Sequence, residues 1–416
     1  MSAIKRYLFG IFKYDPREIA PLNGLRTLAY FLVIGTHMYR PFEPYIKEPN
    51  DIARNVFNSG SLCMDIFFIL SGFLISGPLF RELDRTNDIR LGVFFSKRTI
   101  RIFPPYFIFL SIQTFIFIPI LMRLQPASME ALTKFQSTAI FDFLYISNYF
   151  YGTVPHGWSL SLEEQFYLLF PVFLLLVFKR IPERFRFASL LLWIIIPTIY
   201  RFLIYKYIIE GVADPIRVKQ LYSGWIYYPL QGRLDSLFAG IILAYTLNRY
   251  PERVYAFLAD KRKRTIALGI AIASIAYISI FVFEFQSSLM SMVFRFNLNN
   301  LAWIIIIILS LRPESFVAKI FSLRIFAPIA KLSYCSYLIH FFLVGIITPA
   351  VINVKDPRYI DFAIWFVPAG FIILGFGYLF HLVAERPFMV WKESKYGKEV
   401  ILAKTENSSL AVKRTD

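Results

Sequence analysis

Long runs of apolar residues alternate with short polar segments along the whole chain. Ten runs can each be read as a helix that crosses about 30 Å of hydrocarbon, and the run at 297–311 is the shortest. The ten runs cover residues 23–39, 61–80, 104–122, 158–178, 187–209, 225–247, 265–284, 297–311, 332–351 and 360–383. The pattern predicts an all-α integral membrane protein, built as a bundle of about ten transmembrane helices.

The composition agrees with this prediction and excludes two other classes of protein. Of the 416 residues, 57% are hydrophobic and 18% are charged. Soluble domains are about 45–50% apolar and about 25% charged, so a single soluble globule is excluded. The 45 Phe, 25 Tyr and 6 Trp exclude a disordered chain. Two cysteines are too few for a disulfide framework.

The net charge of +17 is explained by the positive residues that membrane proteins carry on their cytoplasmic side, and it does not require a nucleic-acid partner. If the N-terminus is cytoplasmic, the predicted inner segments carry 31 of the 45 Lys and Arg residues, and the outer loops carry 10. This bias obeys the positive-inside rule. We therefore predict that both termini are cytoplasmic, that the chain contacts the lipid bilayer, and that it binds no nucleic acid.

The first apolar run is not a cleaved signal peptide, because it contains Arg26 and ends without a small-residue cleavage site. We expect a cytoplasmic N-terminal segment at 1–22, a transmembrane domain at 23–387 and a polar cytoplasmic tail at 388–416. The longest outer loop, at about 123–157, is placed to cover an outward-facing site.

Ionisable groups at membrane depth are costly, so each one needs a reason. Arg26 and His37 lie eleven residues apart, which places them on one helix face and about 16 Å apart along the axis. This layout suits an anionic donor at the inner edge of the membrane and chemistry deeper in the bundle. The alternative is that Arg26 snorkels to the interface and His37 hydrogen-bonds a neighbouring carbonyl group.

A second polar cluster runs from His156 to Tyr167, from the outer boundary into the predicted fourth span. A carboxylate beside an imidazole is a common way to orient a general base. We therefore take His37, His156 and Glu163 as candidate catalytic residues. The alternative is that one glutamate of the Glu163–Glu164 pair neutralises a membrane arginine.

A third cluster contains Arg98 and Arg101, which share a helix face just before Pro104. They are candidates for binding an anionic donor, and the alternative is that they only set topology. Arg233 and Asp235 lie near the outer start of the predicted sixth span, where an ion pair with a neighbouring helix is the simpler explanation.

Other chemistry is less compatible with the sequence. There is no GxGxxG, GxxxxGK[ST] or GxSxG motif, so neither a nucleotide-binding fold nor a hydrolase elbow is expected. The four histidines show no HExxH pattern, so we expect no metal site. His340 and His381 are more simply explained as hydrogen-bonded interior histidines than as catalysts.

Taken together, these motifs resemble those of the membrane acyltransferase-3 family. They follow the family's order from about residue 23 to residue 387 and are highly specific as a set. The matching segments are 23–26 with His37, 65–75 with Ser71, 98–104, 156–167 with Trp158 and Tyr167, 233–235 with Gly240, 332–340 and 385–387.

The resemblance implies an enzyme of the cell inner membrane that transfers an acyl group, usually acetyl, from cytoplasmic acyl-CoA to a sugar hydroxyl. The acceptor would be a carbohydrate or glycolipid of the envelope, such as lipopolysaccharide or another polysaccharide. Acyl-CoA would be a substrate, with no tightly bound cofactor. The chain resembles the stand-alone type, without a fused C-terminal esterase-like domain.

The family motifs also imply roles for individual residues. His37 would be the catalytic histidine, and Arg26, Arg98 and Arg101 would hold the donor. Glu163 matches the family's carboxylate better than Glu164 does.

We predict that donor and acceptor reach one buried site from opposite sides of the membrane, near His37 and Glu163. His37 would act as general base, while a covalent acyl-enzyme remains an alternative. A rival hypothesis is a proton-coupled transporter or flippase of an envelope precursor that uses Arg26, His37 and Glu163 as a proton relay.

Overall fold

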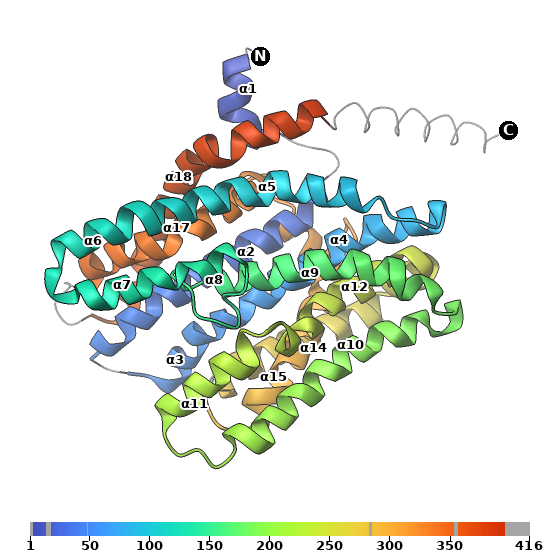
Figure 1. The fold of residues 1–416 in the computed structure, drawn as a ribbon. Coiled ribbons are helices and arrows are strands. Elements are labelled where there is room, and N and C mark those ends of the chain that lie inside the picture. Colours follow the sequence, from blue (N-terminus) through green and yellow to red (C-terminus); the bar gives the residue numbers. More distant parts are fainter. Residues whose placement is uncertain (1–2, 14–17, 48, 283–284, 353–356, 396–416) are drawn as a thin grey trace.

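The computed structural model describes residues 3–13, 18–47, 49–282, 285–352 and 357–395, and within these ranges it contains helices and no β-strand (Figure 1). The α-helices are α1 (Ala3–Phe9), α2 (Ala20–Phe42), α3 (Asp51–Asn58), α4 (Met64–Thr86), α5 (Leu91–Ile112), α6 (Ile118–Leu124), α7 (Met129–Ser137), α8 (Ala139–Phe143), α9 (Gly157–Leu176), α10 (Glu183–Ile204), α11 (Pro215–Leu221), α12 (Leu234–Arg249), α13 (Pro251–Ala259), α14 (Lys261–Phe281), α15 (Arg295–Ser310), α16 (Phe316–Phe321), α17 (Phe326–Ile352) and α18 (Tyr359–Phe380).

Eight helical segments of the described chain are long and apolar enough to cross a membrane. Several of them join an α-helix to an adjoining π-helix or 3-10 turn. They are Asp51–Thr86, Leu91–Leu124, Gly157–Arg180, Glu183–Ile209, Lys261–Phe281, Met290–Ser310, Phe326–Pro349 and Tyr359–Lys395. The prediction of an all-α integral membrane protein is therefore confirmed, while the count of ten spans and the cytoplasmic termini stay predictions.

Two predicted spans, 23–39 and 225–247, are not among these eight segments. The helix at 23–39 is too polar, and the helix at 225–247 is too short. Helix α2 covers 23 residues but carries Arg26, His37 and Arg40, which lower its mean hydropathy. Helix α12 has 16 residues and starts at Leu234, because a π-helix and a 3-10 turn occupy most of 222–232. Both helices pack in the interior of the bundle, α2 against α17 and α12 against α4.

Helices α4 and α12 make the most extensive helix–helix contact in the described structure. Gly72 on α4 and Gly240 on α12 make this approach possible. A Cβ atom at Gly72 would clash with the carbonyl oxygen of Leu237, and one at Gly240 would clash with that of Ile69. The backbones of the two helices are thus in direct contact, as small residues allow in membrane bundles.

The predicted third span begins earlier than expected. Helix α5 starts at Leu91 and contains Pro104 and Pro105 in its interior, so these prolines do not open it. Arg98 and Arg101 consequently lie within the helix, on the face that lines a cavity. In the sequence, arginines that face an internal cavity resemble the charged residues that flank a membrane span. This resemblance explains why the third span was predicted to start too late.

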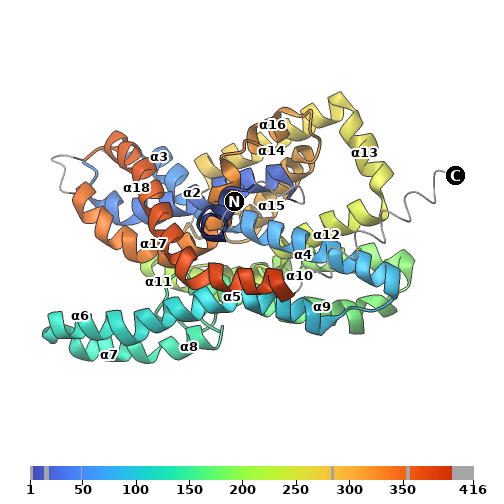
Figure 2. The same ribbon diagram turned by 90° about the horizontal axis from the view of Figure 1, so that it is seen from above.

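The longest predicted outer loop, 123–157, contains helices α7 and α8, which lie beside α6 at one edge of the molecule in Figure 2. Asp142 on α8 holds the chain that follows, because its Oδ2 accepts hydrogen bonds from the backbone N–H groups of Thr153, at 2.6 Å, and Val154, at 3.1 Å. Burial raises the pKa of Asp142 to about 6, against these stabilising hydrogen bonds.

The ends of the described chain lie together. The hydroxyl of Tyr7 on α1 donates to the carbonyl of Leu382, and that of Tyr378 donates to Leu8, at 2.6 Å each. Helical structure continues to residue 395, into the segment predicted as a polar tail. Residues 396–416, the rest of that predicted tail, lie outside the described residues.

Candidate active site

Two cavities lie inside the bundle, and they contain most of the predicted site residues. The first has a volume of about 790 Å³ and is lined by polar side chains from α2, α4, α5 and α9. Its polar lining includes all three predicted donor arginines, both glutamates of α9, a serine of α4 and a tyrosine of α9, namely Arg26, Arg98, Arg101, Glu163, Glu164, Ser71 and Tyr167. The sequence motifs of four separate helices therefore meet at one cavity.

A hydrogen-bonded cluster organises the first cavity. The hydroxyl of Ser71 donates to Oε1 of Glu163 at 2.6 Å, and the Tyr167 hydroxyl lies 3.1 Å from the same serine oxygen. The guanidinium of Arg98 lies 5.3 Å from the centre of the Tyr167 ring, and it interacts electrostatically with Glu163, as Arg26 does. The cluster thus joins a carboxylate to two arginines in a buried, low-dielectric site.

The second cavity has a volume of about 560 Å³ and contains His37. Aromatic side chains form much of its wall, among them Trp158, Tyr227, Tyr228 and Phe341. The two cavities share two lining residues, Met64 and Tyr337. Arg26 and His37 therefore line different cavities, although both face the interior of the bundle from α2.

His37 belongs to a cluster of three histidines. Its Nδ1 lies 2.8 Å from Nε2 of His340 on α17. The His340 ring lies 4.6 Å from that of His156, and 5.1 Å from that of Tyr337. Sequence reasoning treated His340 as an interior histidine and missed this contact, although its three-residue spacing from Tyr337 placed both residues on one helix face.

The hydrogen bonds of His340 assign the protons of both rings. Its Nδ1 lies 2.5 Å from the carbonyl oxygen of Tyr337, and a carbonyl group only accepts, so Nδ1 carries the proton. With both imidazoles neutral, Nε2 of His340 is then the acceptor and Nδ1 of His37 the donor. Nε2 of His37 is left as the basic nitrogen.

In the described part of the chain, no hydrogen bond joins Glu163 to a histidine, so the predicted contact between this carboxylate and an imidazole is not observed. Glu163 accepts a hydrogen bond from Ser71, with Tyr167 as a further partner, and it lines the first cavity, whereas His37 lines the second. Helix geometry also separates Glu163 from His156, because Glu163 lies seven positions further along the chain, a rise of about 10 Å along the axis of α9.

His156 lies at the start of α9 and is 2% exposed. Its ring packs against Tyr337, at 4.8 Å between ring centres, and stacks on Phe341 at 5.7 Å. It lines neither of the two cavities. The structure therefore places His156 behind the His37–His340 pair rather than at a cavity surface.

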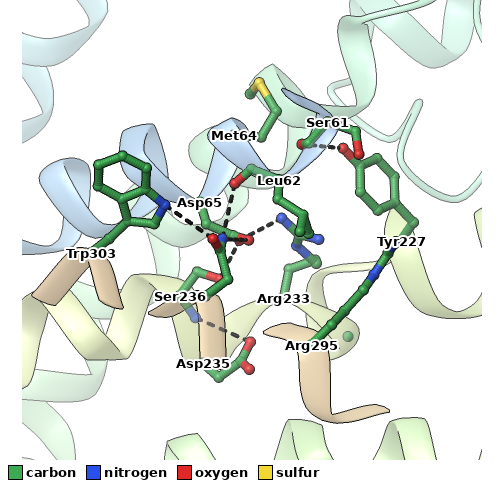
Figure 3. Close-up of polar contacts among 12 residues, drawn as sticks. Ser61, Leu62, Met64, Asp65, Tyr227, Arg233, Asp235, Ser236, Arg295 and Trp303 are labelled. Atoms are coloured by element: carbon green, nitrogen blue, oxygen red, sulfur yellow. Dashed lines mark hydrogen bonds and ion pairs between the residues drawn. The ribbon is translucent and has the colours of Figure 1, made fainter. Parts of the chain in front are cut away.

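Arg233 and Asp235 form buried ion pairs and line neither of the two cavities. Figure 3 shows the pair between Arg233 and Asp65. Arg233 bonds Asp65 on α4 at 2.5 Å, and Asp235 bonds Arg201 on α10 at 2.8 Å. Asp65 also accepts hydrogen bonds from Ser236 at 2.5 Å and from Asn299 at 2.8 Å. These residues tie α4, α10, α12 and α15 together, which agrees with the simpler explanation given for Arg233 and Asp235.

One further group of buried side chains joins α17 to the end of α18. The ligand atoms of Cys335, His381 and Glu385 lie within 4.8 Å of one another. Oε2 of Glu385 accepts hydrogen bonds from Nδ1 of His381 at 2.7 Å and from Sγ of Cys335 at 3.2 Å. These bonds stabilise the carboxylate without an ion, and the absence of a metal centre stays a prediction.

Comparison with known proteins places the chain beside bacterial O-acetyltransferases. A peptidoglycan O-acetyltransferase, OatA, of Listeria monocytogenes is 27% identical over 94% of this chain and 62% of its own length. A putative O-acetyltransferase of Staphylococcus aureus is 26% identical over 91% of this chain and 59% of its own length. An O-acetyltransferase OatA of Staphylococcus aureus is 27% identical over 83% of this chain and 54% of its own length.

The chain thus spans about three fifths or less of the length of these curated relatives. No solved structure matches it. The acyltransferase domain that defines a known family matches residues 19–382, from the start of α2 to the end of α18. The match covers both cavities and the clusters between them, and the chain therefore belongs to the acyltransferase-3 family.

Proposed function

We propose that this protein transfers an acetyl group from acetyl-CoA to a hydroxyl group of a cell-envelope glycan, from a position in the cytoplasmic membrane. The observation that carries the proposal is the arrangement of the two cavities, one lined by arginines and the other containing His37. Two of the relatives are an O-acetyltransferase and a peptidoglycan O-acetyltransferase, which supports acetyl as the acyl group and a peptidoglycan-like acceptor.

The donor would bind in the first cavity. Coenzyme A carries phosphates, and Arg26, Arg98 and Arg101 line this cavity. Arginine binds phosphate through two parallel charge-assisted hydrogen bonds. Glu163 accepts the Ser71 hydrogen bond beside Arg98, so we assign it to hold the donor arginines in place rather than to act on the base.

The acceptor would bind in the second cavity, beside His37. Aromatic faces suit the apolar faces of sugar rings, and Trp158, Tyr227 and Tyr228 supply three of them. Nε2 of His37 is the basic nitrogen left by the hydrogen bond to His340. His37 would therefore take a proton from the acceptor hydroxyl as general base.

The transfer then proceeds as a direct displacement at the thioester. The hydroxyl proton moves to Nε2 of His37 while the acceptor oxygen forms a bond to the carbonyl carbon of the acyl group. The bond between this carbon and the sulfur breaks, and the sulfur leaves with the electron pair. The proton on His37 passes to the thiolate, so that an acetyl ester and free coenzyme A are the products.

The test is acetyl transfer by the purified protein in lipid nanodiscs, with labelled acetyl-CoA and muropeptides as acceptors, followed by mass spectrometry. His37→Ala should lower turnover by about 10²–10⁴-fold, as expected for loss of a general base. The matched control is His381→Ala, which removes a buried histidine outside both cavities and should keep most of the turnover. A wild-type protein that binds acetyl-CoA but acetylates no envelope glycan would contradict the proposal.

A further inference from the structure

We infer that Met64 and Tyr337 form a partition between the two cavities, and that Met64 limits the size of the acyl group that reaches His37. The inference rests on the proposed function, because it assumes a donor in the first cavity. It is carried by one observation, that these two residues line both cavities.

The two cavities follow one another through the bundle. The first is lined by α4 from Arg81 to Met64, and these seventeen residues correspond to a rise of about 25 Å. The second begins at Met64 and is lined by α2 from Val33 to Pro41. Since His37 lines only the second cavity, an acyl group bound in the first cavity must pass Met64 and Tyr337 to reach it.

Tyr337 is the fixed side of the partition. Its hydroxyl lies 2.7 Å from Oγ of Ser159, and its ring stacks on that of His340 at 5.1 Å. Its carbonyl oxygen also holds Nδ1 of His340. Rotation of the Tyr337 ring would break its hydrogen bond to Ser159 and its stacking on His340, the residue that hydrogen-bonds His37. Two contacts therefore hold this side chain in place.

Met64 is the movable side. It is the first residue of α4, and its sulfur lies 3.9 Å from the Tyr337 hydroxyl, a contact at the limit for sulfur. A methionine side chain is unbranched and adopts many conformations at low cost. Rotation of this one side chain opens a passage about as wide as the side chain itself, which suits a short acyl group.

The experiment measures kcat/KM for acetyl-CoA and hexanoyl-CoA with one glycan acceptor. In Met64→Ala the ratio of hexanoyl to acetyl transfer should rise by at least about tenfold, the scale on which apolar pockets discriminate chain length. In Met64→Phe acetyl transfer should fall by a similar factor, while the Kd of acetyl-CoA, measured by calorimetry, stays unchanged. The Phe variant tests the partition even where the Ala variant folds poorly.

Met292→Ala is the matched control, because Met292 is fully buried and lines neither cavity. It should leave the hexanoyl-to-acetyl ratio at the wild-type value. Normal acetyl transfer with an unchanged ratio in Met64→Ala, and unchanged acetyl transfer in Met64→Phe, would overturn the partition alone. Absence of transfer from every acyl-CoA in the wild-type protein would instead overturn the proposed function on which it rests.

Discussion

At the scale of single residues, the basicity of His37 depends on a side chain from a distant part of the sequence. His340 commits Nδ1 to the Tyr337 carbonyl and so presents Nε2 to His37. In many enzymes a carboxylate takes this orienting position. Here Glu163, the carboxylate predicted to lie beside the histidine, accepts a hydrogen bond from Ser71 instead, and a second imidazole holds His37.

In the proposed mechanism His340 is a positioning residue, so the effect of its replacement should depend on the hydrogen-bonding capacity of the new side chain. His340→Gln offers an amide oxygen to Nδ1 of His37, whereas His340→Leu has similar bulk and no acceptor. We expect turnover to fall about 10-fold in the Gln variant and more in the Leu variant, because the loss of an oriented hydrogen bond costs about 1–3 kcal/mol. Equal turnover in the two variants, measured at matched protein stability, would contradict this role.

The arginines that line the first cavity allow a second prediction at this scale, which tests their proposed contact with the donor. Arg98→Ala should weaken acetyl-CoA binding by 1.5–3 kcal/mol, or roughly 10- to 150-fold, if the guanidinium contacts phosphate. Arg98→Lys should restore only part of this affinity, because a point charge replaces a planar fork. Calorimetry measures both values. Arg90→Ala is the control, since Arg90 is exposed and pairs with Glu82 outside the cavities.

The residues that line the cavities could be predicted where a sequence motif places an ionisable group inside a membrane span, because such a group is energetically costly there. Glu163, His37 and the three arginines of the first cavity were singled out in this way, and each of them lines a cavity, while their roles stay predictions. The partners of these groups were not predictable, because Ser71 and Glu163 are 92 residues apart and His37 and His340 are 303 apart. A spacing rule applies within one helix and carries no information across such distances.

At the scale of elements, the turn before α9 depends on Asp142. The carboxylate of Asp142 accepts from Thr153 and Val154, and His156 follows directly. Side chains at positions 152 and 157 would clash with this carboxylate, and both positions are glycine. The sequence predicts a long loop here. It does not show that the end of this loop is held by hydrogen bonds to the buried side chain of Asp142, and only the structure shows this.

This acid predicts a pH dependence of stability. Burial raises the pKa of Asp142 from 3.8 to about 6, so between about pH 4 and pH 6 the folded protein holds a proton that the unfolded chain has released. The free energy of unfolding therefore falls as pH rises through this window, by at most about 1.4 kcal/mol per pH unit. Asp142→Asn should lose this part of the slope in thermal melts of the detergent-solubilised protein.

The control for this prediction is an exposed acid of the same loop region. Glu130 lies on the exposed side of α7. The variant Glu130→Gln should therefore show the same dependence of stability on pH as the wild-type protein. A wild-type slope in Asp142→Asn would show that the carboxylate does not bind the extra proton.

At the scale of the whole molecule, four helices are held together by charges that no lipid contacts. The ion pairs Asp65–Arg233 and Arg201–Asp235 are fully buried, and the rings of Phe68, Tyr227 and Phe296 surround the Arg233 guanidinium at 4.7–5.6 Å. Removal of one partner from a buried pair leaves an uncompensated charge and costs about 3–5 kcal/mol, whereas replacement of both by apolar residues costs far less.

We therefore expect that Arg233→Leu does not accumulate as folded protein. The double variant Asp65→Leu with Arg233→Leu should recover much of the lost stability, because it leaves no unpaired charge. Size-exclusion profiles and thermal melts of detergent-purified protein measure this recovery. If the double variant is less stable than the single one, the pair is stabilising in its own right and the argument from an unpaired charge is wrong.

The Asp65–Arg233 pair also has a consequence for the order of events during synthesis. The two residues are 168 positions apart, and chains grow at roughly 5–20 residues per second. Asp65 therefore enters the membrane about 10–30 s before the cation that neutralises it has been made. During that interval α4 carries a carboxyl group that has no cation beside it and is costly to expose to lipid, so we expect the nascent chain to stay with the insertion machinery until α12 arrives.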